Sequence, residues 1–254
     1  MHTHTDHQDG PQSCHVSNLA CNYGAIDFQD ELADFIAGVN QLEGCASSLH
    51  QQAEDIHIPF CSVPVFHNIK FTKCKPLRES KISDSVHTQP EAVGLHMQII
   101  PAWFDTIIVH QDRPNGLSNN KGMYLIDKTG HLTNHYTGVC IAQMRIVFQI
   151  PKRAILNVAP SLSTSTHLAY VEWFSPLTAA PDPKHHMYKV TRLMKNGWRS
   201  AGVIHMDSIL GSMHLFPRFG ATVPQKWNNL NVLEKCNAFY VNPFSDINSY
   251  MWFV

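Results

Sequence analysis

The amino-acid sequence predicts a mainly β protein, an antiparallel sandwich or partly open barrel preceded by a short helical segment. From residue 95 onward, short apolar runs alternate with polar residues and are separated by Gly, Pro and Asn, a pattern typical of strands. Long amphipathic helices do not alternate with these runs, which argues against a doubly wound parallel sheet. We therefore expect a disordered tail over residues 1–26, an acidic helical segment over 27–56 and a β domain over 57–254.

The first two parts differ in their apolar content. Residues 1–25 are mostly polar, which favours a disordered tail. Residues 27–43 carry apolar side chains at spacings of three and four, which predicts an amphipathic helix. This stripe consists of Phe28, Leu32, Phe35, Ile36, Val39 and Leu42. Asp27 is placed to cap the helix, and a second helical stretch is expected over 46–55.

The first half of the β domain contains one clear strand and one ambiguous stretch. Residues 57–71 fit an edge strand, because Pro59 and Pro64 lack the amide donor that a central strand needs. Residues 75–94 are polar and predict a loop. Residues 95–110 predict one or two strands, broken at Pro101.

Later strands are marked by alternation and by a turn signal. Every second residue from 144 to 150 is apolar, which predicts that these side chains share one apolar face. They are Met144, Ile146, Phe148 and Ile150. Residues 187–193 and 201–206 flank an Asn196-Gly197 pair, which predicts a hairpin. Short strands are also expected over 167–174 and 236–242.

Composition restricts the classes of function. The 254 residues carry 19 Lys and Arg against 20 Asp and Glu, a net charge of −1, so nothing global favours nucleic acid or an anionic membrane. The charge is nevertheless divided: residues 1–94 carry 12 acidic and 5 basic groups, and residues 95–254 carry 8 and 14. Seven Cys without a C-x-x-C spacing predict free thiols. The longest apolar run, 97–109, is too short to span a bilayer, and we expect no membrane partner.

One segment has the composition of a nucleic-acid contact. Residues 183–206 contain no acidic side chain and interleave basic with aromatic residues, which suits phosphate contacts and base stacking. The candidate binding residues are Lys184, Lys189, Arg192, Lys195, Trp198 and Arg199. The alternative is a solvated hairpin whose lysines protect an edge strand from pairing.

Other chemistry has weaker signals. His and Cys gather within residues 2–21, but a second ligand pair at zinc spacing does not follow. The sequence lacks a P-loop and the G-x-S-x-G and H-E-x-x-H motifs. We therefore predict no catalytic residue, no metal site and no cofactor.

Several stretches carry a resemblance to a known family. They are HIPFCSVPVFHNIKF, IIPAWFDTIIVH, TGVCIAQMRIVFQIP, HLAYVEWFSPL, MYKVTRLMKNGWRSAGVIHMDSILGSMHLFPRFG and NVLEKCNAFYVNPFSD. Over about residues 27–250, the chain resembles the C-terminal region of transposase-like proteins of the Plavaka type, found in mushroom-forming fungi. The resemblance implies cut-and-paste DNA transposition by an acidic, metal-binding triad. The matched region follows that catalytic core, so the resemblance assigns no catalytic residue here, and an N-terminal zinc finger is not recognised. We expect a C-terminal piece of a larger transposase-like protein.

A fold-level similarity to the bromo-adjacent homology barrel rests on Val171–Phe174 and Val203–Ile209. The combined interpretation is a non-catalytic module, derived from a transposase-like protein, that contacts nucleic acid or chromatin in the nucleus. A protein-interaction domain is the alternative, its basic face pairing with an acidic partner or with the chain's own N-terminal segment, and the cytoplasm is the alternative location. A metal-dependent nuclease or transposase is the third possibility.

Overall fold

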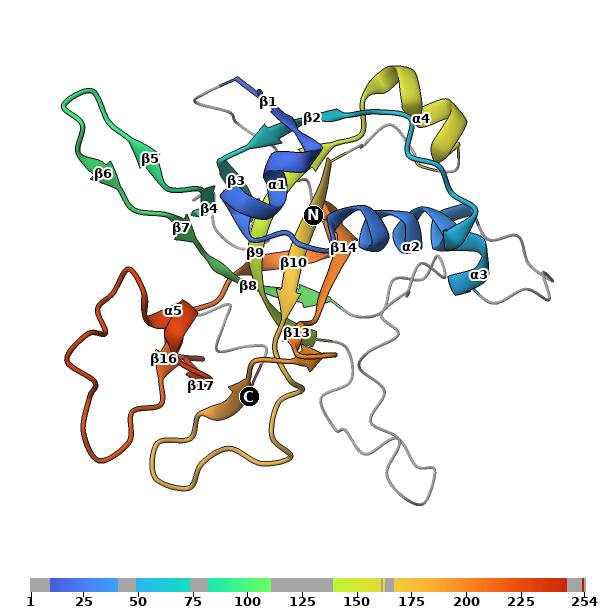
Figure 1. Ribbon diagram of the computed structural model, residues 1–254. Coiled ribbons are helices and arrows are strands. Elements are labelled where there is room, and N and C mark those ends of the chain that lie inside the picture. Colours follow the sequence, from blue (N-terminus) through green and yellow to red (C-terminus); the bar gives the residue numbers. More distant parts are fainter. Residues whose placement is uncertain are drawn as a thin grey trace.

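The computed structural model describes residues 10–40, 49–73, 82–110, 139–160, 162, 167–245 and 253 (Figure 1). Its helices are α1 (Val16–Tyr23), α2 (Phe28–Asn40), α3 (Leu49–Glu54), α4 (Lys152–Val158) and α5 (Val232–Lys235), with a 3₁₀ turn at Met206–Ser208. Its strands are β1 (Gln12–His15), β2 (Ser62–Phe66), β3 (Asn68–Lys73), β4 (Ile82–Gln89), β5 (Ala92–Val93), β6 (Ile99–Ile100), β7 (Trp103–Phe104), β8 (Thr106–His110), β9 (Val139–Gln149), β10 (His167–Trp173), β11 (Tyr188–Thr191), β12 (Met194–Lys195), β13 (Trp198–Arg199), β14 (Ala201–His205), β15 (Ile209–Ser212), β16 (Leu215–Pro217) and β17 (Ala238–Val241).

The main sheet is built around β9, and every strand pair in it is antiparallel. One edge of β9 pairs with β10, which pairs in turn with β14. The other edge pairs with β8 at one end and with β2 at the other, and β15 and β1 extend these two branches. The predicted mainly β, antiparallel fold is therefore confirmed. Across the described residues, the sheets are not closed into a barrel, and the arrangement is sandwich-like.

Apolar side chains cover the main sheet on both faces. On one face, the ring of Phe28 from α2 meets the ring of Phe148 from β9 edge-on, with 4.9 Å between the centroids. On the other face, Phe71 of β3 and Val86 of β4 join the residues of β9, β10 and β14 in a second apolar cluster. A third cluster joins β8 and β9 to the small sheet of β11, β17 and β16. The expected stripe of α2 is buried from Phe28 to Val39, and Leu42 lies outside the described residues.

A β-bulge changes the expected face of one residue in β9. Tyr170 is paired with Ile146 and the next residue, Val171, with Met144, so Arg145 is the extra residue of β9. Ile146 packs in the cluster below α2, whereas Met144 packs in the cluster on the other face. The prediction of one shared apolar face was therefore wrong for Met144, because a bulge adds one residue to a period of two.

The described part of the expected tail, residues 10–26, is ordered. β1 pairs with β2 along its length, and α1 follows it directly. Leu19 and Tyr23 of α1 are buried, and the hydroxyl of Tyr23 lies 2.8 Å from Nε2 of His67. Gly24 ends the helix at φ 73°, a left-handed conformation that glycine adopts without strain. A few apolar residues thus anchor a segment whose overall composition is polar; residues 1–9 lie outside the described part.

Two further stretches differ from their predicted structure. The predicted loop over 75–94 contains β4 and β5. The stretch over 95–110 divides at Pro101, as expected, but its halves have opposite environments. β5 and β6 form a projecting hairpin (Figure 1) on which Leu95 is 99% exposed, whereas Ile107 of β8 is fully buried.

The predicted Asn196-Gly197 turn is confirmed, but the long hairpin around it is not. Both turn residues have positive φ angles, 53° and 84°, and they join β12 to β13. The flanking strands diverge, because β11 pairs with β17 in a small sheet while β14 pairs with β10 in the main sheet. None of the described helices is long and apolar enough to cross a membrane.

Candidate functional site

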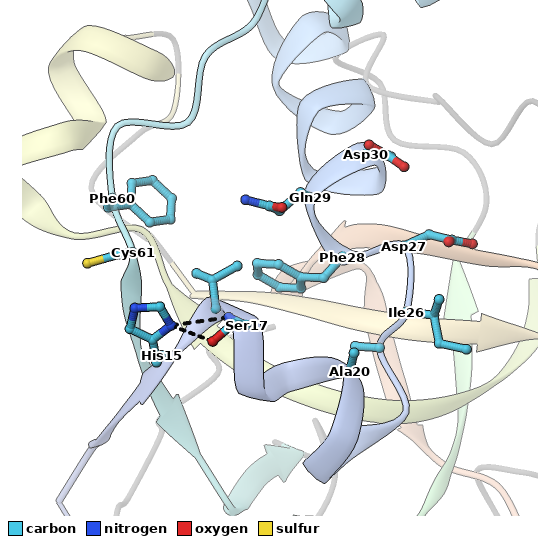
Figure 2. Close-up of a pocket in the computed structure, with 12 residues that line it drawn as sticks. His15, Ser17, Ala20, Ile26, Asp27, Phe28, Gln29, Asp30, Phe60 and Cys61 are labelled. Carbon is cyan, nitrogen blue, oxygen red and sulfur yellow. Dashed lines mark hydrogen bonds between the residues drawn. The ribbon is translucent and has the colours of Figure 1, made fainter.

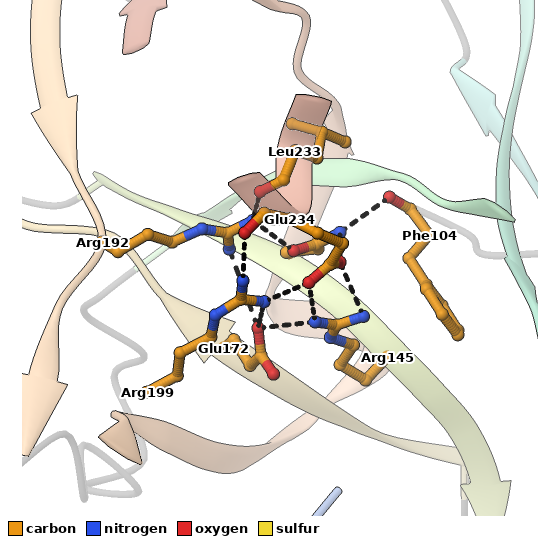
Figure 3. A network of polar contacts seen from close by, with 8 residues as sticks. Phe104, Arg145, Glu172, Arg192, Arg199, Leu233 and Glu234 are labelled. Carbon is orange, nitrogen blue, oxygen red and sulfur yellow. Dashed lines mark hydrogen bonds and ion pairs between the residues drawn. The ribbon is translucent and has the colours of Figure 1, made fainter. Parts of the chain in front are cut away.

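Five charged side chains meet where β9, β10, β13 and α5 approach one another (Figure 3). They are Arg145, Glu172, Arg192, Arg199 and Glu234. We call this set the Arg–Glu cluster. The Glu172 carboxylate accepts hydrogen bonds from Arg145 at 3.0 Å and from Arg199 at 2.9 Å. The Glu234 carboxylate bridges the same two guanidinium groups, at 2.9 Å from Arg145 Nη1 and 2.6 Å from Arg199 Nη1.

The bulge in β9 and the ends of neighbouring strands produce this arrangement. Arg145 is the bulge residue, and bulges commonly redirect a side chain out of the regular alternation. Arg192 directly follows β11, where its backbone bridges that of Phe174. Its guanidinium carbon lies 4.4 Å from the centroid of the Phe174 ring, a cation–π contact. Arg192 therefore belongs to the buried part of the cluster, and its guanidinium group packs on an aromatic ring.

Arg192 is the most deeply buried of the predicted nucleic-acid-binding residues. It is only 8% exposed, and its Nη2 donates to Gln143 Oε1 at 2.6 Å and to the backbone carbonyl of Leu233. Burial lowers the pKa of Arg192, and the nearby Arg199 charge lowers it further, against the opposing effect of Glu172. Arg192 thus belongs to the interior of the fold.

Glu234 forms the outer side of the cluster. Burial raises the pKa of its carboxyl group, but the charges of Arg145 and Arg199 outweigh this effect and hold the pKa at about 2. The side chain is 40% exposed, against 6% for Glu172. At neutral pH the cluster contains three cations and two anions, so it keeps one excess positive charge.

The remaining predicted residues are spread over the surface of the same segment. Lys195 and Trp198 are exposed and form a cross-strand pair in the β12–β13 hairpin. Lys184 is exposed in the loop before β11, and Lys189 is half-buried on β11. The predicted binding residues therefore fall into two groups. The guanidinium groups of Arg192 and Arg199 point into the cluster, whereas the three lysines and the indole of Trp198 lie at the surface.

Sequence reasoning missed Arg145, Glu172 and Glu234. A signal was available for the first two, because each interrupts a strongly apolar strand, and a charged residue in a buried strand requires a partner. Glu234 had no such signal, because it does not interrupt an apolar strand and it reaches the cluster only through the tertiary fold.

The acidic helix α2 lies close to the basic β12–β13 hairpin. α2 packs against β14, which directly follows the hairpin. Burial raises the pKa of Glu31 on α2 to about 7; the positive charge of Lys195 opposes this rise, and Asp34, Asp27 and Asp30 add to it. The positive charge of Lys195 therefore acts on the Glu31 carboxyl group.

Glu31 should make stability dependent on pH. Its pKa is higher in the folded chain than the ordinary 4.5, so the folded state takes up a proton between about pH 4.5 and 7 and stability falls as pH rises through that window. Glu31→Gln should raise the free energy of unfolding at pH 8 by about 1–3 kcal/mol and leave it nearly unchanged near pH 4.5. Urea titrations at the two pH values measure this difference. The exposed Glu91→Gln is the matched control, and an equal effect of Glu31→Gln at both pH values would contradict the assignment.

A pocket of about 360 Å³ lies where the start of α2 approaches α1 and residues 60–61 (Figure 2). Phe28 and Phe60 contribute aromatic surface, and His15 Nδ1 lies 2.7 Å from Ser17 Oγ. Cys61 adds an exposed free thiol. Within the described ranges, three or more His, Cys, Asp or Glu side chains do not gather closely enough to hold a metal ion.

Comparisons of the chain with protein-family models, with curated proteins and with solved structures find no match.

Proposed function

We propose that this chain is a non-catalytic module that contacts nucleic acid or chromatin in the nucleus, derived from a transposase-like protein. The observation that carries the proposal is the β12–β13 hairpin, where Lys195 stands directly opposite a 59% exposed Trp198. A cation beside a free indole can hold a phosphate while a base stacks on the ring. The left-handed turn at Asn196-Gly197 places the two residues opposite each other on neighbouring strands, so their backbone positions are set before any ligand binds.

The Arg–Glu cluster supports this hairpin from beneath. Arg199 occupies the same short strand as Trp198, and its guanidinium group is held by both Glu172 and Glu234. This anchoring ties the hairpin to β10 and α5. In the proposed mode of binding, the exposed Lys184 and half-buried Lys189 add sequence-independent charge at the surface of the same segment.

A second candidate function is a protein-interaction domain whose basic surface pairs with the chain's own acidic helix. The electrostatic interaction between Lys195 and Glu31 favours it. The two functions predict different consequences for Lys195. A nucleic-acid contact makes Lys195 important for ligand affinity, whereas internal pairing makes it important for stability, with coupling to Glu31.

Replacement of Lys195 tests the proposal. Lys195→Glu should weaken binding of a 30-nucleotide single-stranded DNA roughly tenfold at low salt and reduce the slope of log affinity against log salt by about one. Trp198→Ala should weaken binding by a similar factor through lost stacking. Fluorescence anisotropy with labelled DNA, over a series of salt concentrations, measures both effects.

Lys152→Glu is the control for this experiment, because it reverses an exposed charge on α4 and should leave most of the binding intact. Equal binding by the Lys195→Glu and Lys152→Glu variants would contradict the nucleic-acid proposal. In that case, a double-mutant cycle between Lys195→Met and Glu31→Gln, read by urea unfolding, decides whether internal pairing is the role of the hairpin.

A further inference from the structure

The segment that carries Glu234 is anchored to the body by partly buried side chains alone, among them Trp227, Val232 and Leu233, which pack against the third apolar cluster. Residues 218–235 connect β16 to β17, extend from the body as a long loop (Figure 1) and contain no buried residue. Segments with few buried apolar contacts open at low free-energy cost. We call residues 218–235 the strap. Its best-defined polar attachment is to the Arg–Glu cluster.

That attachment uses one anion and two carbonyl oxygens. The Glu234 carboxylate binds Arg145 and Arg199, the backbone carbonyl of Glu234 accepts from Arg199 Nη2 at 2.9 Å, and the carbonyl of Leu233 accepts from Arg192. All three guanidinium groups therefore direct donors at the end of the strap (Figure 3). Guanidinium forks of this kind match the oxygens of a phosphate as well as those of a carboxylate.

The cluster also holds donors that the strap leaves unused. Nε of Arg145 and both Nε and Nη1 of Arg192 are buried and make no hydrogen bond. Buried donors without acceptors are costly, and each one calls for an explanation. If the strap lifts, three guanidinium groups remain with only Glu172, and the local charge rises from +1 to +2.

We propose that Arg145, Arg192 and Arg199 form a phosphate-binding site that Glu234 masks as an internal substitute for the anion. Binding exchanges one anion for another: the strap releases its carboxylate to solvent, and a phosphate takes its place among the three guanidinium groups. This inference rests on the proposed nucleic-acid function, in which the phosphate belongs to the nucleic-acid backbone and the site lies beside the Lys195–Trp198 hairpin. A free phosphate ion offers the same chemistry.

The first test removes the mask. Glu234→Gln keeps the shape of the side chain and deletes its charge, and Glu91→Gln removes an exposed charge elsewhere. The Glu234→Gln variant should bind single-stranded DNA roughly tenfold more tightly than wild type at low salt. It should also gain a phosphate-dependent rise in melting temperature at constant ionic strength, which the Glu91→Gln variant lacks. A folded Glu234→Gln variant that behaves like the Glu91→Gln variant overturns the inference.

The second test uses the unaltered protein. Trypsin cleaves after Lys235, which directly follows Glu234 in α5, so cleavage at this site requires this end of the strap to leave the cluster. Inorganic phosphate should accelerate this cleavage several-fold relative to chloride at equal ionic strength. Acceleration by both DNA and phosphate supports the nucleic-acid source, and acceleration by phosphate alone assigns the site to free phosphate. No acceleration by either ligand overturns the inference.

The two proposals can fail separately. If Lys195→Glu weakens DNA binding while Glu234→Gln has no effect on DNA or phosphate binding, the proposed function stands and the masked site is excluded. If Glu234→Gln gains phosphate binding while Lys195→Glu leaves DNA binding unchanged, the masked site stands and the hairpin has another role.

Discussion

Glu172→Ala is expected to lower the free energy of unfolding by about 3–5 kcal/mol. The Glu172 carboxylate is 6% exposed and forms ion pairs with Arg145 and Arg199, with Arg192 3.7 Å away. Its removal leaves three guanidinium groups facing the single carboxylate of Glu234, and an uncompensated buried charge is strongly destabilising. Urea unfolding followed by circular dichroism measures the loss.

Two other carboxylate variants serve as controls for Glu172→Ala. Glu91→Ala removes an exposed carboxylate and should change stability by less than about 0.5 kcal/mol. Glu234→Ala should cost less than Glu172→Ala, because the Glu234 side chain is 40% exposed and water can replace part of its contacts. A loss below about 1 kcal/mol for Glu172→Ala would show that the cluster does not depend on this carboxylate for its stability.

Phe148→Ala is expected to lower the free energy of unfolding by about 3–5 kcal/mol, because it leaves a cavity in the main core. Phe148 is fully buried on β9, between Val65 of β2 and Leu168 of β10, and its ring meets Phe28 of α2. This residue joins the acidic helix to the sheet. Chemical denaturation measures the loss, and a double-mutant cycle with Phe28→Ala should give a coupling of about 0.5–1.5 kcal/mol.

The control for the core substitution is Phe216→Ala on β16. This ring is 41% exposed, so its removal should cost less than about 1 kcal/mol. Similar losses for Phe148→Ala and Phe216→Ala would contradict the placement of Phe148 at the centre of the fold.

Local signals in the sequence were sufficient for several elements. The spacing of Phe28, Leu32 and Phe35 predicted the buried face of α2, because a helix repeats every 3.6 residues wherever it packs. The Asn196-Gly197 pair predicted its turn, because few other residues accept two successive positive φ angles. The mainly β class followed from repeated short alternations of the same kind.

Elements whose outcome depended on distant partners could not be predicted in this way. The polar composition of residues 10–26 concealed Leu19 and Tyr23, which become buried only because β2 and the main sheet lie beside them. Leu95 and Ile107 are equally apolar in sequence, yet one projects into solvent on a hairpin and the other fills the core.

The candidate site shows the same division most clearly. Composition and local pattern were enough to predict that residues 183–206 are basic and aromatic, and that Asn196-Gly197 turns the chain between Lys195 and Trp198. The inward direction of Arg192 and Arg199 depends on tertiary contacts. The direction of a guanidinium group is set by the nearest carboxylates, and these come from β10 and α5, which are remote from each other in sequence. A bulge at Arg145 then added a third cation, because one extra residue in a strand reverses the face on which a side chain lies.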